Sequence, residues 1–445
     1  MMEGVIWRPL LQFFFPILLG TFFQQLYNTV DAMVVGKFVG KVALAAVGGA
    51  TGNLINLLVG FFVGLSSGAT VILSQFWGAR QTDGVQRAVH TAAAMALLGG
   101  ALLMGIGLLF SEQLLTLMGT PAEVMPGAVT YIRIYFLGTI PMMIYNIGSG
   151  LLRAVGDSRR PLLFLVASCM TNIVLDVLFV LGMNMGVAGA AYATILSEAV
   201  SAVLVVLTLM RSTLPYRLHL RKIRLDMPLL GQILRIGFPA GLQSVLYSIS
   251  NVIIQVSVNG FGTDVLAAWT AYGKMDGLFW MTSSAFGVAI TTFAGQNFGA
   301  KQYDRMRRGV MVCLGMAAVA TLLLSATLLS LGGGLFRLFS SDEAVVAQGL
   351  KILHLLVPTY ITYLGIEIFA GAVRGAGDSL IPTLMTLAGV CVLRLIWVLG
   401  IAPSHHDVTF MLLCYPITWS VTSLMFIAYY FKGGWLQRCI RKAAR

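Results

Sequence analysis

Residues 150–161 read GLLRAVGDSRRP, and residues 371–382 repeat the pattern as GAVRGAGDSLIP. Other segments recur in the same order, at offsets that stay between 221 and 223. They are Phe15-Pro16 with Phe238-Pro239, Asn28 with Asn251, QFWGA at 75–79 with QNFGA at 296–300, and Asp83 with Asp304. Several ordered matches at a nearly constant offset predict that the chain consists of two related halves.

The composition predicts that both halves lie in a membrane. Of the 445 residues, 58% are hydrophobic and only 10% are charged, whereas a soluble domain has about 25% charged residues. A membrane span needs about 20 mostly apolar residues. Twelve segments qualify: 9–36, 43–78, 87–118, 122–154, 161–181, 186–212, 232–258, 265–297, 308–338, 346–374, 381–400 and 408–431. We therefore predict an all-α integral membrane protein with twelve transmembrane helices in two pseudo-symmetric six-helix bundles.

The number of spans fixes how the halves are related. Six spans per half is an even number, so both halves have the same orientation and are related by an axis along the membrane normal. We predict an N-terminal lobe at 1–212, a cytoplasmic linker at 213–231, a C-terminal lobe at 232–431 and a basic cytoplasmic tail at 432–445.

The formal net charge of +12 indicates orientation. Most Lys and Arg lie in alternate loops and the tail, while the other loops hold only Lys37, Lys41 and Arg337. Since basic loops stay in the cytoplasm, both termini are expected there, in a multi-pass protein of the plasma membrane, as in a prokaryotic inner membrane. Nucleic acid is not an expected partner.

Four polar residues are predicted to lie at one depth in the first half. Asp31 and Asp176 each lie five residues from the outer end of their spans, which is about 8 Å along a helix. Thr194 lies eight residues into the sixth span, at about 12 Å. Asn172 precedes Asp176 by four residues and shares its helix face. Because a carboxylate in hydrocarbon is costly, these residues form a candidate functional site.

The ligand chemistry of these four residues suits a small cation. Two carboxylates, an amide oxygen and a hydroxyl form an all-oxygen set of the kind that binds hard cations. Without a metal, two close buried carboxylates would share a proton, because charge repulsion and lost hydration favour the protonated form. The site can therefore bind Na⁺ or H⁺. The alternative is that these groups only bond one another and hold the helices together.

The second half does not repeat this set of residues. The equivalent of Asp31 is Ile254, and alignment of 180–182 with 398–400 places Arg394 opposite Asp176. We predict ion pairs for Lys274 with Asp276 and for Glu367 with Arg394, with direct substrate contact as the alternative.

A soft cavity that accepts many shapes is expected from the 22 methionines and the many aromatic residues. The candidates for substrate contact are Gln24, Tyr27, Asn28, Tyr131, Tyr135, Tyr145, Asn146, Tyr247 and Asn251.

FPILLGTFFQQLYNTVD at 15–31 and the two Gly-Asp-Ser turns at 150–158 and 371–379 resemble the multidrug and toxic compound extrusion (MATE) family. The resemblance covers essentially the whole chain. It implies two six-helix lobes around a central cavity and antiport of organic cations against Na⁺ or H⁺.

The resemblance also implies roles for particular residues. The cation site of the DinF-like branch falls on Asp31, Asn172, Asp176 and Thr194, and the family's first helix is expected to bend at Pro16. The NorM-like branch has a glutamate on the seventh span that is missing from LYSIS at 246–250.

We expect an exporter of small organic cations or drugs that lies among membrane lipid as a monomer and needs no cofactor besides its coupling ion. A lipid-linked oligosaccharide flippase of the same superfamily is the main alternative. A channel or an intramembrane enzyme remains as a further alternative. The chain has no HExxH, DDxxD or nucleophile-elbow motif, and only His405-His406-Asp407, in a predicted outer loop, offers a metal-binding grouping.

Overall fold

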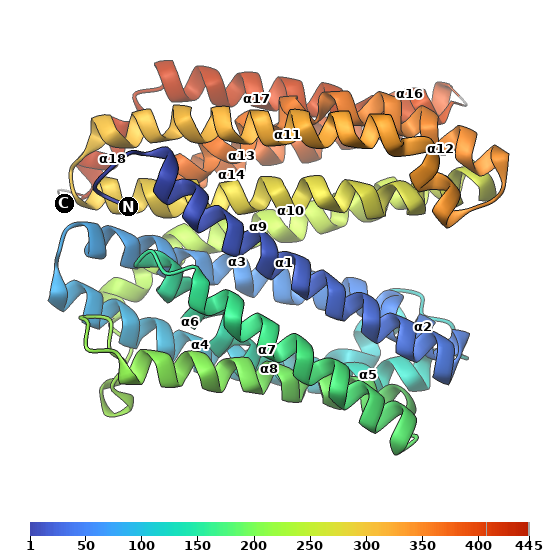
Figure 1. The fold of residues 1–445 in the computed structure, drawn as a ribbon, viewed down its shortest axis with the longest axis horizontal. Coiled ribbons are helices and arrows are strands. Elements are labelled where there is room, and N and C mark those ends of the chain that lie inside the picture. The colour runs from blue at the N-terminus through green and yellow to red at the C-terminus, as the bar shows by residue number, and fades with distance from the viewer. Residues whose placement is uncertain (406, 444–445) are drawn as a thin grey trace. The chain divides into compact units, whose positions relative to one another are not determined.

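The computed structural model describes residues 1–405 and 407–443, and every regular element in that part of the chain is a helix (Figure 1). Up to the middle of the chain the helices are α1 (Trp7–Val34), η1 (Val35–Val39), α2 (Lys41–Gly48), α3 (Ala50–Gly78), α4 (Thr82–Leu117), α5 (Met125–Leu137), α6 (Thr139–Ala154), α7 (Arg159–Asp176), η2 (Val177–Gly182), α8 (Gly186–Arg211), η3 (Leu220–Lys222) and α9 (Met227–Asn259).

The remaining helices are α10 (Thr263–Gly299), α11 (Tyr303–Phe339), α12 (Glu343–Leu356), η4 (Val357–Thr359), α13 (Tyr360–Gly375), α14 (Leu380–Thr386), η5 (Leu387–Val392), α15 (Leu393–Leu395), η6 (Ile396–Ile401), η7 (Ala402–Ser404), α16 (Val408–Leu412), α17 (Cys414–Lys432) and α18 (Trp435–Ala443). Of the short elements, η1, η2, η5 and η6 are π-helical. His406 lies outside the described residues.

The helices confirm the predicted number of membrane spans. Eleven spans in the described chain are long and apolar enough to cross a membrane. The twelfth is the pair α5 and α6, which bends by 51° between Leu137 and Thr139. At the bend, the Thr139 hydroxyl donates to the Phe136 carbonyl at 2.8 Å. The prediction of twelve helices is therefore confirmed, and the fourth of them is broken in the middle.

The chain divides into two compact units, which are described separately. One comprises residues 15–245, and the other comprises residues 1–14 and 246–445. Both divisions fall inside a helix, because α1 and α9 each begin in one unit and end in the other. The lobe boundaries drawn from the sequence repeat stay a prediction.

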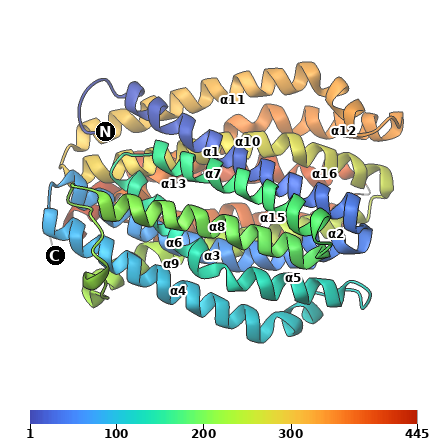
Figure 2. The ribbon, with the colours of Figure 1, turned by 60° about the horizontal axis from the view of Figure 1, so that its bottom comes forward.

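The unit of residues 15–245 has a core formed by α3, α4, α6 and α8, with α7 lying along α8 (Figures 1 and 2). Val89, Phe136 and Leu152 are fully buried in this core, together with Ile233 from the start of α9. The first part of α9 thus belongs to the core of the first half of the sequence.

Glycines let α3 and α9 cross at backbone contact. A Cβ atom on Gly68 would lie 2.2 Å from the Ile233 carbonyl oxygen, and one on Gly237 would lie 2.0 Å from the Leu65 carbonyl oxygen. Gly64 and Gly241 meet at the next turn in the same way. The spacing is Gly-xxx-Gly on both helices, the pattern that permits close helix packing in membranes.

In the other unit, α10 packs against α11 and α13, and α13 packs against α17. The rings of Phe279 and Tyr360 stack with centroids 4.1 Å apart, beside the buried Trp419. The C-terminal helix α18 docks here through Trp435, and its Lys442 pairs with the buried Asp378 at 3.5 Å. The predicted basic tail at 432–445 is therefore helical and packed over 435–443, and residues 444–445 lie outside the described chain.

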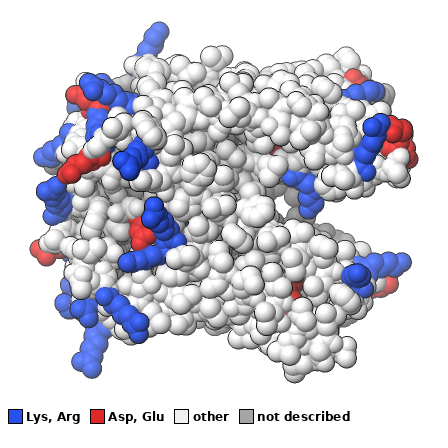
Figure 3. Space-filling view, in the orientation of Figure 1, with Lys and Arg blue, Asp and Glu red and all other residues white. Residues whose placement is uncertain are grey.

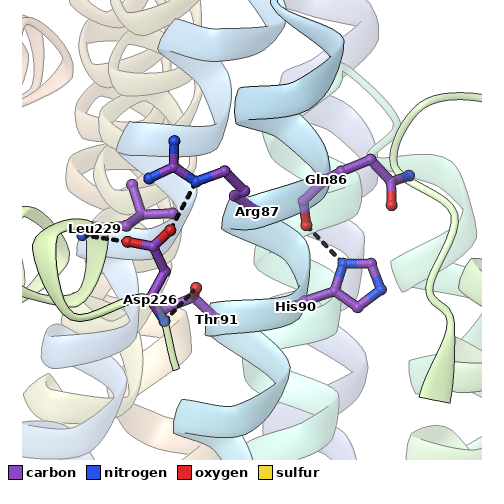
Figure 4. A network of polar contacts seen from close by, with 6 residues as sticks. All are labelled: Gln86, Arg87, His90, Thr91, Asp226 and Leu229. Carbon is purple, nitrogen blue, oxygen red and sulfur yellow. Dashed lines mark hydrogen bonds and ion pairs between the residues drawn. The ribbon is translucent and has the colours of Figure 1, made fainter. Parts of the chain in front are cut away.

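The predicted linker at 213–231 is anchored to α4 (Figure 4). Arg87 donates to the Asp226 carboxylate at 2.7 Å, and the Asp226 N–H donates to the Thr91 hydroxyl at 3.3 Å. Nearer the start of the linker, the His219 N–H donates to His90 Nε2 at 3.1 Å. Asp226 also accepts from the Leu229 N–H at 3.2 Å, so it caps the first turn of α9. The linker is thus tied to its unit at both ends.

We expect Gly68→Val to destabilise the protein strongly, because its side chain would overlap backbone atoms of α9. Gly231→Ala on α9 is the matched control, since a Cβ atom there meets nothing within 4 Å. Thermal unfolding of the purified variants, followed by tryptophan fluorescence, measures the effect. Overpacking of this kind typically costs about 1–3 kcal/mol. A Gly68→Val protein that melts like Gly231→Ala would contradict the close crossing.

The Arg87 hydrogen bond lowers the pKa of the Asp226 carboxyl below its ordinary value. The pair therefore stabilises the docked linker above about pH 4 and loses this effect as the pH falls further. We expect Asp226→Asn to speed tryptic cleavage at Arg217 and Arg221 at neutral pH. Asp83→Asn, which changes a carboxylate in the first turn of α4, is the control. Equal cleavage rates in wild type and Asp226→Asn would show that the ion pair does not hold the linker.

Candidate cation site

The helix pair α7 and α8 carries three of the four predicted site residues. Asn172 and Asp176 lie on the last turns of α7, and Thr194 lies on α8. The Ser168 hydroxyl donates to the Ser197 carbonyl at 2.8 Å, which ties the two helices together beside the site. Asp176 is also the last residue before the π-helical segment η2. Such π-helical turns often mark functional positions.

All four predicted residues are buried, and five polar atoms on three of them lack hydrogen-bond partners among the described residues. The exposed fractions are 6% for Asp31, 4% for Thr194, and 0% for both Asn172 and Asp176. Asp31 Oδ1, both carboxylate oxygens of Asp176 and both polar atoms of the Asn172 amide have no hydrogen-bond partner among the described residues. Four of these five atoms are oxygens, which can coordinate a cation, whereas the Asn172 amide nitrogen is a hydrogen-bond donor and cannot.

The two carboxylates face each other. Asp31 and Asp176 interact through their side chains, although they come from the first and fifth predicted spans. Here α1 lies close to α7, since a Cβ atom on Gly20 would be 3.3 Å from a methyl group of Leu165. The pair cannot carry two full charges in an apolar surrounding unless a cation or a shared proton lies between them.

Thr194 differs from the other three residues, because its hydroxyl has a hydrogen-bond partner within its own helix. Its hydroxyl donates to the Ala190 carbonyl of the preceding turn at 3.0 Å, which leaves its oxygen lone pairs available as acceptors. The structure thus places Asp31 against Asp176, with Asn172 one turn before Asp176 on α7 and Thr194 on the neighbouring α8. The role of these residues in binding a cation stays a prediction.

An aromatic wall lies beside the four residues. Tyr131 and Tyr135 stack on α5 with ring centroids 6.2 Å apart, and Tyr131 interacts with Asp31 and Thr194. Glu198, one turn beyond Thr194 on α8, interacts with both tyrosines and with Tyr27. Glu198 is not among the four predicted cation ligands, but its four-residue spacing from Thr194 predicts that it lies next to them on the same helix face.

The remaining predicted contact residues of this unit lie farther along the helices. Gln24 and Asn28 are exposed on α1, on either side of the partly buried Tyr27. Tyr145 donates to the Pro161 carbonyl at 3.2 Å, and the Asn146 amide donates to the Met142 carbonyl at 2.9 Å. Tyr145 and Asn146 thus have bonds within the chain. Helix α1 continues through Pro16, and the bend expected there stays a prediction.

Tyr247 and Asn251 belong to the other unit, where they line a separate cavity with Asp276, Glu367 and Arg394. The two ion pairs predicted there are wrong. Asp276 accepts hydrogen bonds from Tyr360 at 2.7 Å and from Trp280 at 2.7 Å, and Lys274 is exposed.

Glu367 is likewise bonded to a tyrosine, because it accepts from the Tyr363 hydroxyl at 3.2 Å. In both cases a tyrosine or tryptophan donates to the carboxylate in place of the predicted Lys or Arg. The spacing of four residues in Asp276–Trp280 and Tyr363–Glu367 was the available sequence signal.

Neither the site around Asp31 nor the cavity around Asp276 contains a cluster of three or more His, Cys, Asp or Glu that could hold a metal ion, as far as the structure describes the chain. Across 1–405 and 407–443, no group of three or more His, Cys, Asp or Glu side chains is placed to hold a metal ion. The set around Asp31 and Asp176 has two carboxylates and neutral oxygens, which is the donor set of a hard cation and not of zinc or copper.

The sequence repeat has a direct counterpart in the comparison with known families. The MatE model matches residues 16–178 and again residues 239–398, with one match in each half of the sequence. The chain belongs to the MatE family. It is therefore a MATE transporter and not an enzyme, as the sequence predicted.

Relatives of this MATE chain match over nearly its full length. The probable multidrug resistance protein YpnP of Bacillus subtilis (strain 168) is 32% identical over 395 residues, which cover 88% of this chain and 87% of the relative. The probable multidrug resistance protein YoeA of the same organism is 27% identical over 96% of this chain and 93% of its own.

Solved structures confirm the fold. A structure described as the outward-facing conformation of a multidrug resistance MATE family transporter of the MOP superfamily has a TM-score of 0.91 at 21% identity. The match covers 99% of this chain and 98% of that one.

The substitution Asn172→Leu tests whether the unpartnered amide binds a ligand or stabilises the fold. Replacing an unpartnered buried amide with an apolar group of similar size should raise the free energy of unfolding of the ion-free protein by about 1 kcal/mol. We expect a higher melting temperature in choline chloride and no further increase on adding NaCl. In the control Asn146→Leu an existing hydrogen bond is lost, so no gain is expected. A destabilised Asn172→Leu protein would assign the amide a structural role.

Proposed function

We propose that this MATE transporter is a cation-coupled antiporter that exports small, amphipathic organic compounds by alternating access, with Na⁺ or H⁺ as the coupling ion. The main support is the set of four unsatisfied oxygen atoms on Asp31, Asn172 and Asp176. Relatives named as multidrug resistance and multidrug export proteins support drug-like cargo.

In this proposal the coupling ion acts on the facing carboxylates. An ion entering from outside neutralises Asp31 and Asp176 and removes their repulsion, so that α1 can repack against α7 near Pro16. The repacking lowers the affinity for outgoing cargo. Because a ligand shifts a conformational equilibrium only by its difference in affinity between the states, coupling requires the ion to bind one arrangement of α1 better than the other.

The ligand chemistry favours Na⁺ over H⁺ as the first ion to test. Asn172 and Thr194 offer neutral oxygens, which Na⁺ needs to replace its hydration shell and which a proton does not need. H⁺ would then compete at low pH by protonating the carboxylates.

For the orientation we propose that both termini face the cytoplasm of a prokaryotic cell. In the unit that contains α18, the basic groups Arg305, Arg438 and Lys442 lie with the chain termini, and Figure 3 shows Lys and Arg gathered toward the helix ends. Basic residues on one side of the spans favour retention on the cytoplasmic side.

Asp31→Asn should abolish gradient-driven export while leaving expression and melting temperature close to wild type. The amide remains polar and nearly isosteric but cannot carry the charge that the coupling ion neutralises. Uptake of a fluorescent cationic dye into everted vesicles, driven separately by a Na⁺ gradient and a proton gradient, is the measurement. Asp378→Asn, a buried carboxylate in the other unit, is the control. Full dye transport by Asp31→Asn would refute the coupling role.

Conservative changes at the neutral ligands then identify the ion. In Thr194→Val the hydroxyl is lost with little change of volume, so Na⁺ dependence should weaken more than proton-driven transport does. Dye efflux with Na⁺ titrated at fixed pH measures this difference. If the Na⁺ dependence of Thr194→Val equals that of wild type, H⁺ is the better assignment.

A further inference from the structure

The unit of residues 1–14 and 246–445 contains a polar cavity of about 440 Å³. Four of its helices and the short α15 contribute lining residues, which are Tyr247, Asn251, Asp276, Trp280, Ser284, Tyr363, Glu367, Arg394 and Tyr415. A volume of this size is in the range that holds a small organic molecule. The Asp31 site contributes no residue to it.

The two acidic groups of the cavity are held in place by the chain. Asp276 accepts from Tyr360, Tyr272 and Trp280 at 2.7, 3.2 and 2.7 Å. Glu367 accepts from Tyr363 at 3.2 Å. Its second carboxylate oxygen packs on Gly287, where a Cβ atom would lie only 1.9 Å away. These contacts fix the positions of both negative groups.

Arg394, in contrast, has no anionic partner. Arg394 is only 2% exposed, and its guanidinium stacks on the Tyr415 ring with 4.4 Å between Cζ and the ring centroid. Within the described chain no ion pair reaches Arg394, and its buried Nε–H has no acceptor. An arginine side chain does not lose its proton in proteins. A permanent buried charge without a partner is costly, and it points to an anionic group that binds in the cavity.

We propose that Arg394 binds the carboxylate of a zwitterionic amphipathic cargo whose basic nitrogen is held by Asp276 or Glu367. A guanidinium presents N–H donors in a planar fork that matches a carboxylate. A simple anion would be repelled by the two acidic groups of the cavity, and a simple cation would be repelled by Arg394. A molecule that carries both charges can pair with Arg394 and with an acidic residue.

The rings of the cavity suit the apolar part of such a molecule. Trp280 and Tyr363 pack edge to face with centroids 4.8 Å apart and present a rigid aromatic surface. Aromatic side chains bury large area at low cost in conformational entropy. The cargo class is therefore an aromatic or polycyclic compound with a carboxylate and a basic amine. This inference rests on the proposed export function, because it names the cargo of that function.

The test compares two dyes that differ by one charge. A rhodamine with a free benzoate is zwitterionic, and its ethyl ester is a cation of nearly the same shape. Binding of both dyes to purified, detergent-solubilised protein is measured by fluorescence polarisation for wild type, Arg394→Gln and Arg394→Lys. Arg133→Gln is the matched control, since it removes a half-exposed arginine that pairs with Glu112 in the other unit.

We expect Arg394→Gln to weaken binding of the free dye by about tenfold or more, which is the loss of one charge-assisted pair. Binding of the ester should change less than about twofold by the same argument. Arg394→Lys should retain part of the preference, because it keeps the charge without the fork. Equal loss for both dyes would show that Arg394 only supports the fold, and no loss for either would show that it does not contact cargo. Either result overturns the proposal.

Two further arms separate the remaining explanations. Phosphatidylethanolamine has the same zwitterionic chemistry, and if it displaces the free dye from wild type but not from Arg394→Gln, the cavity holds a lipid headgroup and the cargo assignment fails. Vesicle transport of both dyes is measured separately. Absence of transport by wild type would refute the proposed export, whereas binding without a gradient tests only the Arg394 contact.

Discussion

Hydrocarbon offers no hydrogen bonds, so every polar group that these helices bury must find a partner inside the protein or in what it binds. Asp31 and Asp176 meet this constraint in its hardest form, since two carboxylates of like charge face each other where Asn172 also lacks partners. The helices α7 and α8, tied by Ser168 and Ser197, hold this arrangement in place. A packing role alone would have favoured apolar residues here, because replacing buried ionic groups with apolar ones is often stabilising.

The same half of the chain also depends on glycine. The crossing of α3 and α9 at Gly68 and Gly237 brings two backbones into contact and joins the beginning of α9 to the core of residues 15–245. Both helices that pass from one unit to the other, α1 and α9, contain a proline at repeat-equivalent positions, Pro16 and Pro239. The chain therefore passes between the two units within two long helices, α1 and α9.

Sequence patterns were sufficient where a single physical rule decides the structure. The number of spans follows from hydropathy, and the structure buries all four side chains that the helical rise had selected, Asp31, Asn172, Asp176 and Thr194. The wrong ion pairs had a different cause. Opposite charges at similar depth suggested Glu367 with Arg394, but hydrogen bonds from aromatic residues one turn away satisfy the acids, and only coordinates show which donor is nearer.

The bend between α5 and α6 and the anchoring of the linker to α4 were not predicted. The bend has a local signature that was not used, because Gly138 lies at the break and Pro141 has no N–H to donate to the Leu137 carbonyl. The anchor has no local signature, because it joins Arg87 to Asp226, 139 residues away. Local rules predict helices well, and they do not rank the possible long-range partners of a polar side chain.

The two halves carry opposite charges at one pair of equivalent repeat positions, Asp176 and Arg394. Asp176 precedes the π-helical segment η2, and Arg394 lies between the π-helical segments η5 and η6, so both charges sit beside locally widened helix. Asp176 faces a second acid, Asp31. In the half that contains Arg394, the equivalent of Asp31 is the apolar Ile254. An acid pair needs a cation, and an isolated arginine needs an anion. Since the backbone setting is shared and the sign is reversed, the two sites can bind different partners at once. Under the two proposals, the ion at Asp31 and Asp176 and the cargo carboxylate at Arg394 would not compete for the same atoms.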